Sequence, residues 1–326
     1  MNRRNIVILG GGSGGAVAAN HLGESIGRDH NVILIDQKPQ HYYQSSYLWM
    51  ARGWREPQDI SRDLSTIERR NVRFFNDRII NIDTDSRTVT TAHAEIEYDY
   101  LISSLGFQTH PHLIPGDNHL VHHTWEMDAA LRFREALRTF TSGRLVIGIS
   151  APPYRCPPGP YEAAWLINDD LIERGVRDNV SIDFFTSEPG PLGGSGQPSE
   201  FMREHLNRSG IKLHSNFVID QVDGQASTLR AADGRELPFD LLFIIPPHRP
   251  SQVLIDSGLS SETGIDVDVD TLATRSENVY AIGDSVNLPV SKAGVVAHQQ
   301  ADVVAHNIVH QLTGRGDPTR LRLHTL

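Results

Sequence analysis

The sequence predicts an α/β protein with two parallel-sheet domains, the second inserted into the first. Three observations predict this organisation. Residues 6–9 (IVIL) read as a buried strand and lead through a glycine-rich turn into a helical run. The same order of strand, turn and helix returns at 144–175. A third strand pattern at 278–284 precedes another long helical run, which brings the chain back to the first domain.

Composition sets the broad class. The chain has 326 residues, enough for two domains with cores of their own, and 39% hydrophobic against 21% charged residues indicates a soluble globular protein. A net charge of −10 argues against nucleic acid as a partner. No apolar run reaches the length of a membrane span, and the first strand begins almost at Met1. We therefore expect a cytoplasmic protein, or a periplasmic one if an export signal was removed, with peripheral membrane attachment left open.

The glycine turn after the first strand is the strongest general motif. Gly10 makes the tight turn, Gly12 allows close approach of a pyrophosphate, and Gly15 allows close packing of helix on strand. A second strand at 31–35 ends in Asp36, about 20 residues beyond the last glycine, where a carboxylate accepts ribose hydroxyls. The motif predicts a Rossmann-like dinucleotide site whose cofactor-binding candidates are Gly10, Gly12, Ser13, Gly14, Gly15, Asp36 and Gln37.

Later stretches complete this site and favour FAD. Residues 98–106 read as a strand that runs into a turn at Ser104 and Gly106, and 78–82 is expected to pass the adenine with Ile80. The strand at 278–284 ends in Gly283 and Asp284, at the edge where open α/β sheets bind ligands. A helix is expected from about Lys292 to Leu312.

The turn of the second domain differs from the first. Residues 151–162 (APPYRCPPGPYE) carry five prolines, each of which lacks a backbone N–H donor, so this loop is ill suited to cradle a phosphate. It holds Cys156, the only cysteine of the chain, which excludes an internal disulfide. The alternative is a proline-rich surface loop with an incidental cysteine.

Together these motifs resemble the flavoproteins with two dinucleotide-binding domains. Within them, YRCPPGPYE resembles the loop of flavocytochrome c sulfide dehydrogenases and of sulfide:quinone oxidoreductases, and residues 52–55 (RGWR) and 292–294 (KAG) are similar to further segments of that group. The resemblance implies an FAD-dependent oxidoreductase that oxidises sulfide, or a small thiol or persulfide, and passes electrons to a quinone or cytochrome. It places Asp284 on the flavin ribitol, and Lys292 and Ala293 at the flavin pyrimidine.

The catalytic candidates are Cys156 and Glu162. A cysteine thiolate can carry sulfur as a persulfide, and a partly buried carboxylate can take the proton of H₂S or of the thiol. Glu162 has the spacing from Cys156 that the family uses for its acid/base glutamate, although a first-turn glutamate favoured by the helix dipole is an open alternative. Arg155 could attract the anion or be an exposed surface residue.

The chain also departs from that family. Its members bring a second redox cysteine from a C-terminal segment, whereas this sequence ends at Leu326 without a full C-terminal domain. Either an external thiol or sulfide resolves the persulfide, or a partner subunit supplies the missing part, or catalysis has been lost; a partner subunit or a homodimer is possible. The stretch 44–47 (QSSY) lacks the cysteine that tethers flavin in flavocytochromes, so noncovalent FAD is expected.

The predicted domains are an FAD-binding domain, 1–113 and 251–326, and a second Rossmann-like domain, 114–250, that carries the cysteine loop. Within the second domain, 127–140 and 201–209 read as helices and 189–198 as a loop.

Two other functions stay open. One is an NAD(P)H-dependent flavin reductase or dehydrogenase of the type II NADH dehydrogenase kind, which the proline loop argues against. The other is a non-catalytic FAD-binding subunit. A metal site is not predicted. The histidines that cluster in the sequence are not spaced i, i+4 on a helix and have no cysteine among them; they are His110, His112, His119, His122 and His123.

Overall fold

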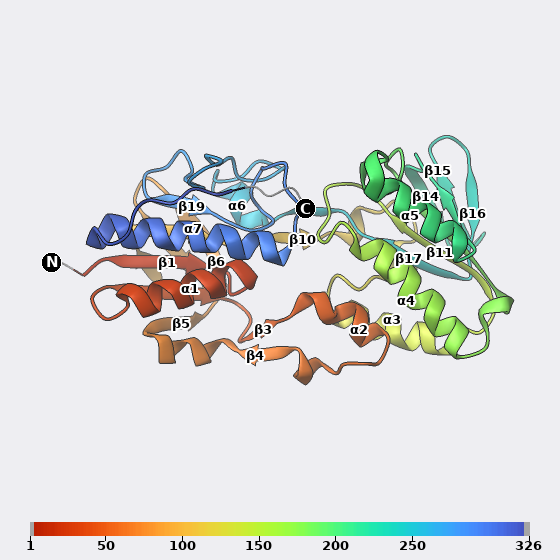
Figure 1. Cartoon of the computed structure of the whole chain (residues 1–326), viewed down its shortest axis with the longest axis horizontal. Coiled ribbons are helices and arrows are strands. Elements are labelled where there is room, and N and C mark those ends of the chain that lie inside the picture. The colour runs from red at the N-terminus through yellow and green to blue at the C-terminus, as the bar shows by residue number, and fades with distance from the viewer. Residues whose placement is uncertain (1–2, 323–326) are drawn as a thin grey trace. The chain divides into compact units, whose positions relative to one another are not determined.

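The computed structural model describes residues 3–322 and divides the chain into two compact units (Figure 1). The first unit contains the chain up to Tyr42, Ser61–Gln108 and the chain from Arg249 onward. The second contains Tyr43–Ile60 and Thr109–His248. Both are built on parallel sheets, which confirms the predicted α/β class with one domain inserted in the other.

The first unit has a five-stranded parallel sheet in the order β19-β9-β1-β2-β5. The bounds of these strands are Asn5–Leu9 (β1), Asn31–Asp36 (β2), Val72–Asn76 (β5), Tyr100–Ser103 (β9) and Val279–Ala281 (β19). The other strands are Gln40–Tyr42 (β3), Ser61–Asp63 (β4), Ile79–Asp83 (β6), Thr88–Thr91 (β7) and Glu95–Glu97 (β8); β3 pairs with β4, and β6 to β8 form an antiparallel sheet.

The two faces of this sheet bury different partners because side chains alternate along a strand. Ile6 and Ile8 of β1 pack with helices α1 (Ser13–Ile26) and α7 (Gly294–Thr313), which lie side by side in Figure 1. Val7 and Leu9 pack in a second core with residues of β6 and β7 and with Leu254 of helix α6 (Gln252–Asp256). The sheet is thus covered on both faces, as its nearly continuous apolar strands require.

The second unit has a four-stranded parallel sheet in the order β13-β12-β11-β17. Its strands are Gly143–Ile149 (β11), Val180–Thr186 (β12), Ile211–His214 (β13) and Leu241–Ile245 (β17), with an antiparallel sheet of Ile219–Asp223 (β14), Thr228–Ala231 (β15) and Glu236–Pro238 (β16). Its helices are Tyr47–Ala51 (α2), Met127–Thr139 (α3), Gly159–Glu173 (α4) and Gly196–Arg208 (α5). Short strands Phe107–Thr109 (β10) and His248–Pro250 (β18) pair with each other where the chain passes between the units.

The structure differs from two expectations. Residues 43–60, expected in the FAD-binding domain, pack on the second unit: α2 contacts α3, and Glu56 accepts a hydrogen bond from Arg134 at 2.9 Å. Helix α5 begins at Gly196, inside the expected loop 189–198. Pro198 permits this start because a proline in the first helical turn loses only an N–H that has no partner there.

The two sheets share one topology. In each, a first strand is followed by a helix and a second strand on one side, a third strand extends that side, and a fourth strand lies on the other side of the first. Each unit also carries an antiparallel three-stranded sheet after its third strand. Because the topology is shared, the glycine turn after β1 and the proline loop after β11 occupy equivalent positions.

Candidate functional site

Two of the glycines after β1 are required by close packing, and one is not. A Cβ on Gly10, whose φ is +94°, would lie 2.5 Å from the Ser104 carbonyl oxygen, and one on Gly15 would lie 1.8 Å from the Gly10 carbonyl oxygen. A Cβ on Gly12 would meet nothing within 4 Å. The space above Gly12 is therefore open, as a pyrophosphate-binding turn requires.

The start of α1 offers unpaired backbone donors. Its first intrahelical bond runs from the Ala16 N–H to the Gly12 carbonyl at 2.9 Å, and Gly12, the N-cap residue, makes no side-chain cap. The N–H groups of Ser13, Gly14 and Gly15 precede that bond and lack intrahelical acceptors by helix geometry. This helix start can bind a diphosphate.

Asp36 closes the turn from the end of β2. One carboxylate oxygen accepts the Gly11 N–H at 2.6 Å and the other accepts the Lys38 N–H at 2.7 Å, while Gln37 beside it is exposed. The ring Nδ1 of His41 lies 2.8 Å from the Gly11 carbonyl oxygen, a contact that the sequence did not suggest. The carboxylate is thereby fixed at the position where ribose hydroxyls are bound in such turns.

Among the candidates at the other strand ends, Ser104 lies beside this turn. A Cβ on Gly14 would lie 2.9 Å from the Ser104 Oγ and 3.2 Å from Ile282, so α1, β9 and β19 meet there. Gly106 has φ +63° and no neighbour at its Cβ position. Ile80 lies on β6, in the antiparallel sheet, with 45% of its surface exposed.

Polar side chains at the ends of β9 and β19 and on α7 include several that lack a hydrogen-bond partner within the described part of the chain. The Gly283 N–H donates to the Gln300 side-chain oxygen at 2.7 Å. Among the described residues, buried side-chain atoms that find no hydrogen-bond partner include Ser103 Oγ, Ser285 Oγ and Gln300 Nε2. Because buried polar atoms are normally paired, this cluster fits a polar ligand such as a flavin with its ribitol chain.

Lys292 is buried beside this cluster. Its ammonium donates to the Val286 carbonyl and lies 5.5 Å from the centre of the Phe107 ring. Burial lowers the pKa of Lys292, and the negative charge of Asp284 partly opposes this. Ala293 is the N-cap of α7, so a helix start and a cation lie together, an arrangement that stabilises negative charge.

The proline loop of the second unit offers no such cradle. The Gly159 N–H donates to the Cys156 carbonyl at 2.8 Å, the Tyr161 N–H donates to the Pro158 carbonyl at 3.1 Å, and Pro160 has no N–H. All three first positions of α4 are therefore unavailable to a phosphate. The sequence predicted a donor-poor loop from its prolines, and the N–H groups of Gly159 and Tyr161 are used in hydrogen bonds within the loop.

Cys156 is exposed and has a left-handed backbone, with φ +58°. Its sulfur lies 3.1 Å from the Cβ position of Gly159, so a side chain larger than glycine there would displace the thiol. Arg155 is not an exposed surface residue: its guanidinium donates to the Gln44 side chain at 2.6 Å and to the Trp125 carbonyl at 2.8 Å. The Trp125 indole donates to the Arg155 carbonyl at 2.9 Å, so Trp125 holds both the backbone and the guanidinium of Arg155.

Glu162 is half-buried in the first turn of α4. Burial raises the pKa of its carboxyl, and a hydrogen bond from the Trp49 side chain on α2 acts in the opposite direction. A raised pKa makes a carboxyl a stronger proton acceptor. Trp49 was missed by the sequence reasoning because residues 43–60 were assigned to the other domain.

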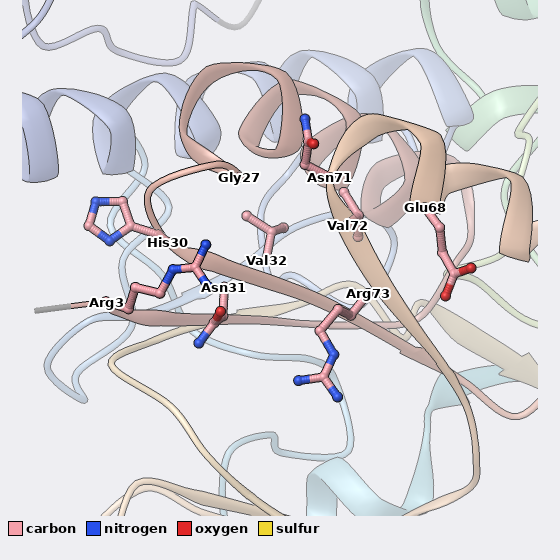
Figure 2. A pocket seen from close by; sticks show the side chains of 9 residues that line it. All are labelled: Arg3, Gly27, His30, Asn31, Val32, Glu68, Asn71, Val72 and Arg73. Carbon is pink, nitrogen blue, oxygen red and sulfur yellow. The ribbon is translucent and has the colours of Figure 1, made fainter.

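A separate hollow of about 350 Å³ lies at the opposite end of the strands of the first sheet (Figure 2). It is lined by Arg3, Gly27, His30, Asn31, Val32, Glu68, Asn71, Val72 and Arg73. These residues surround the amino ends of β2 and β5, whereas the glycine turn and Asp36 lie at the carboxyl ends, where open α/β sheets bind ligands. The hollow is therefore distinct from the dinucleotide turn.

In residues 3–322, no three histidine, cysteine, aspartate or glutamate side chains converge as a metal-binding group. Over the same residues, none of the helices combines the length and apolar character needed to cross a bilayer.

Comparisons with known proteins agree with this geometry. The chain is 26% identical to the sulfide-quinone reductase of Aquifex aeolicus, across 99% of this chain and 80% of the relative. It is 25% identical to the mitochondrial sulfide:quinone oxidoreductase of Dictyostelium discoideum, across 96% of this chain and 72% of the relative. The crystal structure of the Aquifex aeolicus sulfide:quinone oxidoreductase superposes with a TM-score of 0.87 at 24% identity, over 96% of this chain and 78% of that one.

A family profile covers most of the chain. The profile described as pyridine nucleotide-disulphide oxidoreductase matches residues 4–149 and 195–301, which include the glycine turn, both first strands and the Gly283–Asp284 strand end. With that match, and with two parallel sheets of one topology, the chain belongs to the pyridine nucleotide-disulphide oxidoreductase family.

Proposed function

We propose that the chain is an FAD-dependent oxidoreductase that oxidises sulfide at Cys156 and delivers the electrons to a quinone. The similarity to sulfide:quinone oxidoreductases along nearly the whole chain supports this reaction. The observation that carries the proposal is the proline loop, which presents an exposed thiol where a second nucleotide turn would present amide groups. A thiol at that position favours sulfur chemistry over binding of a nicotinamide cofactor.

The first unit would hold FAD noncovalently. The open space at Gly12 and the start of α1 would accept the diphosphate, Asp36 the adenosine ribose, and Asp284 the ribitol. The remaining candidates are Gly10, Ser13, Gly14, Gly15, Gln37, Ile80, Ser104, Gly106, Gly283, Lys292 and Ala293. FAD, when bound, supplies a two-electron sink that a quinone can empty.

The second unit would supply the sulfur and proton chemistry. The thiol of Cys156 and HS⁻ lose their S–H bonds as an S–S bond forms, giving a persulfide anion, two protons and two electrons. Glu162 takes one of the protons, and solvent takes the other. Because Cys156 is the only cysteine in these 326 residues, the outer sulfur then passes to a second sulfide, to a small thiol, or to a group from a partner subunit or second copy.

The chemical nature of the electron acceptor indicates where in the cell the protein works. Quinones dissolve in lipid, so we propose that the protein works at a membrane surface, on either its cytoplasmic or its periplasmic side. A cytochrome is the alternative acceptor, and it would not require a membrane.

Anaerobic reduction tests the proposal directly. Sulfide added to the purified, FAD-loaded protein is expected to bleach its yellow absorbance, and NADH is expected to leave it unchanged. Addition of a quinone after sulfide should restore the colour. Bleaching by NADH would instead support a dehydrogenase of the type II kind, and no bleaching by either would support a non-catalytic FAD-binding subunit.

Changing Trp49 to Phe is expected to move the pH dependence of flavin reduction. The Trp49 hydrogen bond favours charged Glu162, so its loss raises the pKa of Glu162 further. A proton acceptor with a higher pKa becomes deprotonated only at higher pH, so the rising limb of the pH–rate profile should move to higher pH. Stopped-flow reduction by sulfide across the pH range measures this shift.

The matched control is Trp54→Phe. Trp54 lies in the same segment and is exposed, with the Arg52 guanidinium 4.8 Å from its ring centre. Its profile should coincide with that of the unmodified protein. If both variants shift equally, the Trp49–Glu162 hydrogen bond does not set the profile.

A further inference from the structure

The shared topology of the two units identifies Glu188 as the counterpart of Asp36. Asp36 is the last residue of β2, and Glu188 follows β12 by two residues. In the first unit, the carboxylate at this position accepts a hydrogen bond from the turn after the first strand. An acidic residue at this position of a dinucleotide-binding unit is placed to hold ribose hydroxyls.

Glu188 accepts hydrogen bonds from side-chain hydroxyls, whereas the bonds to Asp36 come from backbone N–H groups. The Tyr154 hydroxyl and the Thr186 hydroxyl each lie 3.4 Å from one carboxylate oxygen, and the backbone N–H of Gly193 also donates to the carboxylate. Tyr154 is only 6% exposed. Burial, together with nearby Tyr161 and Glu188, holds the pKa of Tyr154 above its ordinary range, so the hydroxyl keeps its proton and donates it.

Tyr161 extends this network to the start of α4. Its ring stacks on Phe184 of β12 at 4.9 Å between ring centres, and its hydroxyl accepts the Leu192 N–H at 3.3 Å. A side-chain hydrogen bond also links the hydroxyls of Tyr161 and Tyr154. The side chains of Tyr154, Tyr161 and Glu188 thus join the cysteine loop, the start of α4, the end of β12 and the loop near 192.

We propose that Tyr154, Tyr161 and Glu188 form an internal lock, which occupies the place of a nucleotide ribose and fixes the loop that carries Cys156. Tyr154 and Glu188 are then positioning residues for the thiol. The left-handed backbone of Cys156 is costly for a residue other than glycine and persists only where the surroundings hold it. Tyr154 stands two residues before Cys156, so its anchored ring restrains the loop. The catalytic consequence of the lock rests on the function proposed above.

The first test follows the loop itself and needs no substrate. Tyr154→Phe keeps the ring and removes the hydroxyl that donates a hydrogen bond to Glu188. The Gly159 N–H is protected by its bond to the Cys156 carbonyl, so hydrogen exchange at Gly159 should accelerate at least about tenfold in this variant. Glu188→Ala should give the same acceleration. Glu188→Gln keeps an acceptor for the Tyr154 hydroxyl and should recover most of the protection.

The second test measures positioning on the FAD-loaded protein. In Tyr154→Phe, flavin reduction at saturating sulfide should slow about three- to tenfold, and the sulfide concentration for half-saturation should not change. Tyr43→Phe is the matched control, because Tyr43 belongs to the same unit and is 57% exposed. Thermal melting of each variant separates a local release of the loop from general destabilisation.

The outcomes separate the lock from the proposed function. Unchanged Gly159 exchange in Tyr154→Phe would overturn the lock, whatever sulfide does to the flavin. The lock would also be overturned if the Gly159 N–H exchanged as fast in Glu188→Gln as in Glu188→Ala. An acceptor for the Tyr154 hydroxyl would then have no effect on the loop. If exchange responds as expected but sulfide does not bleach the unmodified protein, the lock stands and the proposed function fails.

Discussion

Replacing Cys156 with serine is expected to slow the bleaching of bound FAD by sulfide more than about 100-fold, the scale on which loss of a covalent nucleophile is measured. Serine has nearly the same size and accepts the same backbone, so the loop should keep its shape. Its hydroxyl is not a thiolate and cannot form a persulfide. Stopped-flow absorbance after mixing with sulfide measures the effect.

Two controls accompany this variant. Dithionite, which reduces flavin without a protein thiol, should still bleach Cys156→Ser after free FAD has been removed, and this shows that the variant holds a reducible flavin. After sulfide treatment, the intact mass of the unmodified protein should increase by whole sulfur atoms and that of the variant should not. Equal bleaching rates in the two proteins would remove Cys156 from the reaction.

Changing Gly12 to alanine is expected to weaken FAD binding at least about 100-fold without harming the fold. Gly12 has φ −70° and ψ −169°, an extended conformation that alanine adopts readily, and its added methyl group meets no protein atom. The methyl group would instead fill the space that a pyrophosphate needs. Titration of the FAD-free protein with FAD, followed by flavin fluorescence, measures the loss.

The FAD-free Gly12→Ala protein should keep its stability to within about 1 kcal/mol, because alanine restricts the unfolded chain but is a poorer N-cap residue than glycine. Gly15→Ala gives the contrast. Its methyl group would lie 1.8 Å from the Gly10 carbonyl oxygen, so this variant should lose thermal stability even without FAD. Unchanged FAD affinity in Gly12→Ala would mean that the cofactor does not cross this turn.

The fold and the first unit's turn could be predicted because their causes are local in sequence. Buried-strand runs, the glycine spacing and Asp36 at the end of a strand each follow from neighbouring residues, and the structure shows the packing that requires Gly10 and Gly15. The donor-poor character of the 151–162 loop could likewise be predicted, because a proline lacks an N–H wherever it stands.

The contacts that support the site could not be predicted in this way. Trp49 reaches Glu162 across more than a hundred positions of sequence, and Gln300 reaches Gly283 from inside a helix. Glu188 follows a strand at a position where dinucleotide-binding units carry an acidic residue. Only the structure shows that its carboxylate accepts a hydrogen bond from the Tyr154 hydroxyl. Such pairings depend on how distant segments pack, and neither periodicity nor motif spacing encodes that.

Segment 43–60 also affects how the protein can be dissected. Strands β3 and β4, which flank this segment in sequence, pair with each other in the first unit. The residues between them nevertheless contribute α2 to the second unit. A recombinant fragment of residues 109–248 would expose the apolar surface of α3 that α2 covers, and Arg134 would lose Glu56. Expression of the second half alone therefore calls for grafting 43–60 onto it, since a contiguous cut leaves part of its core in the other fragment.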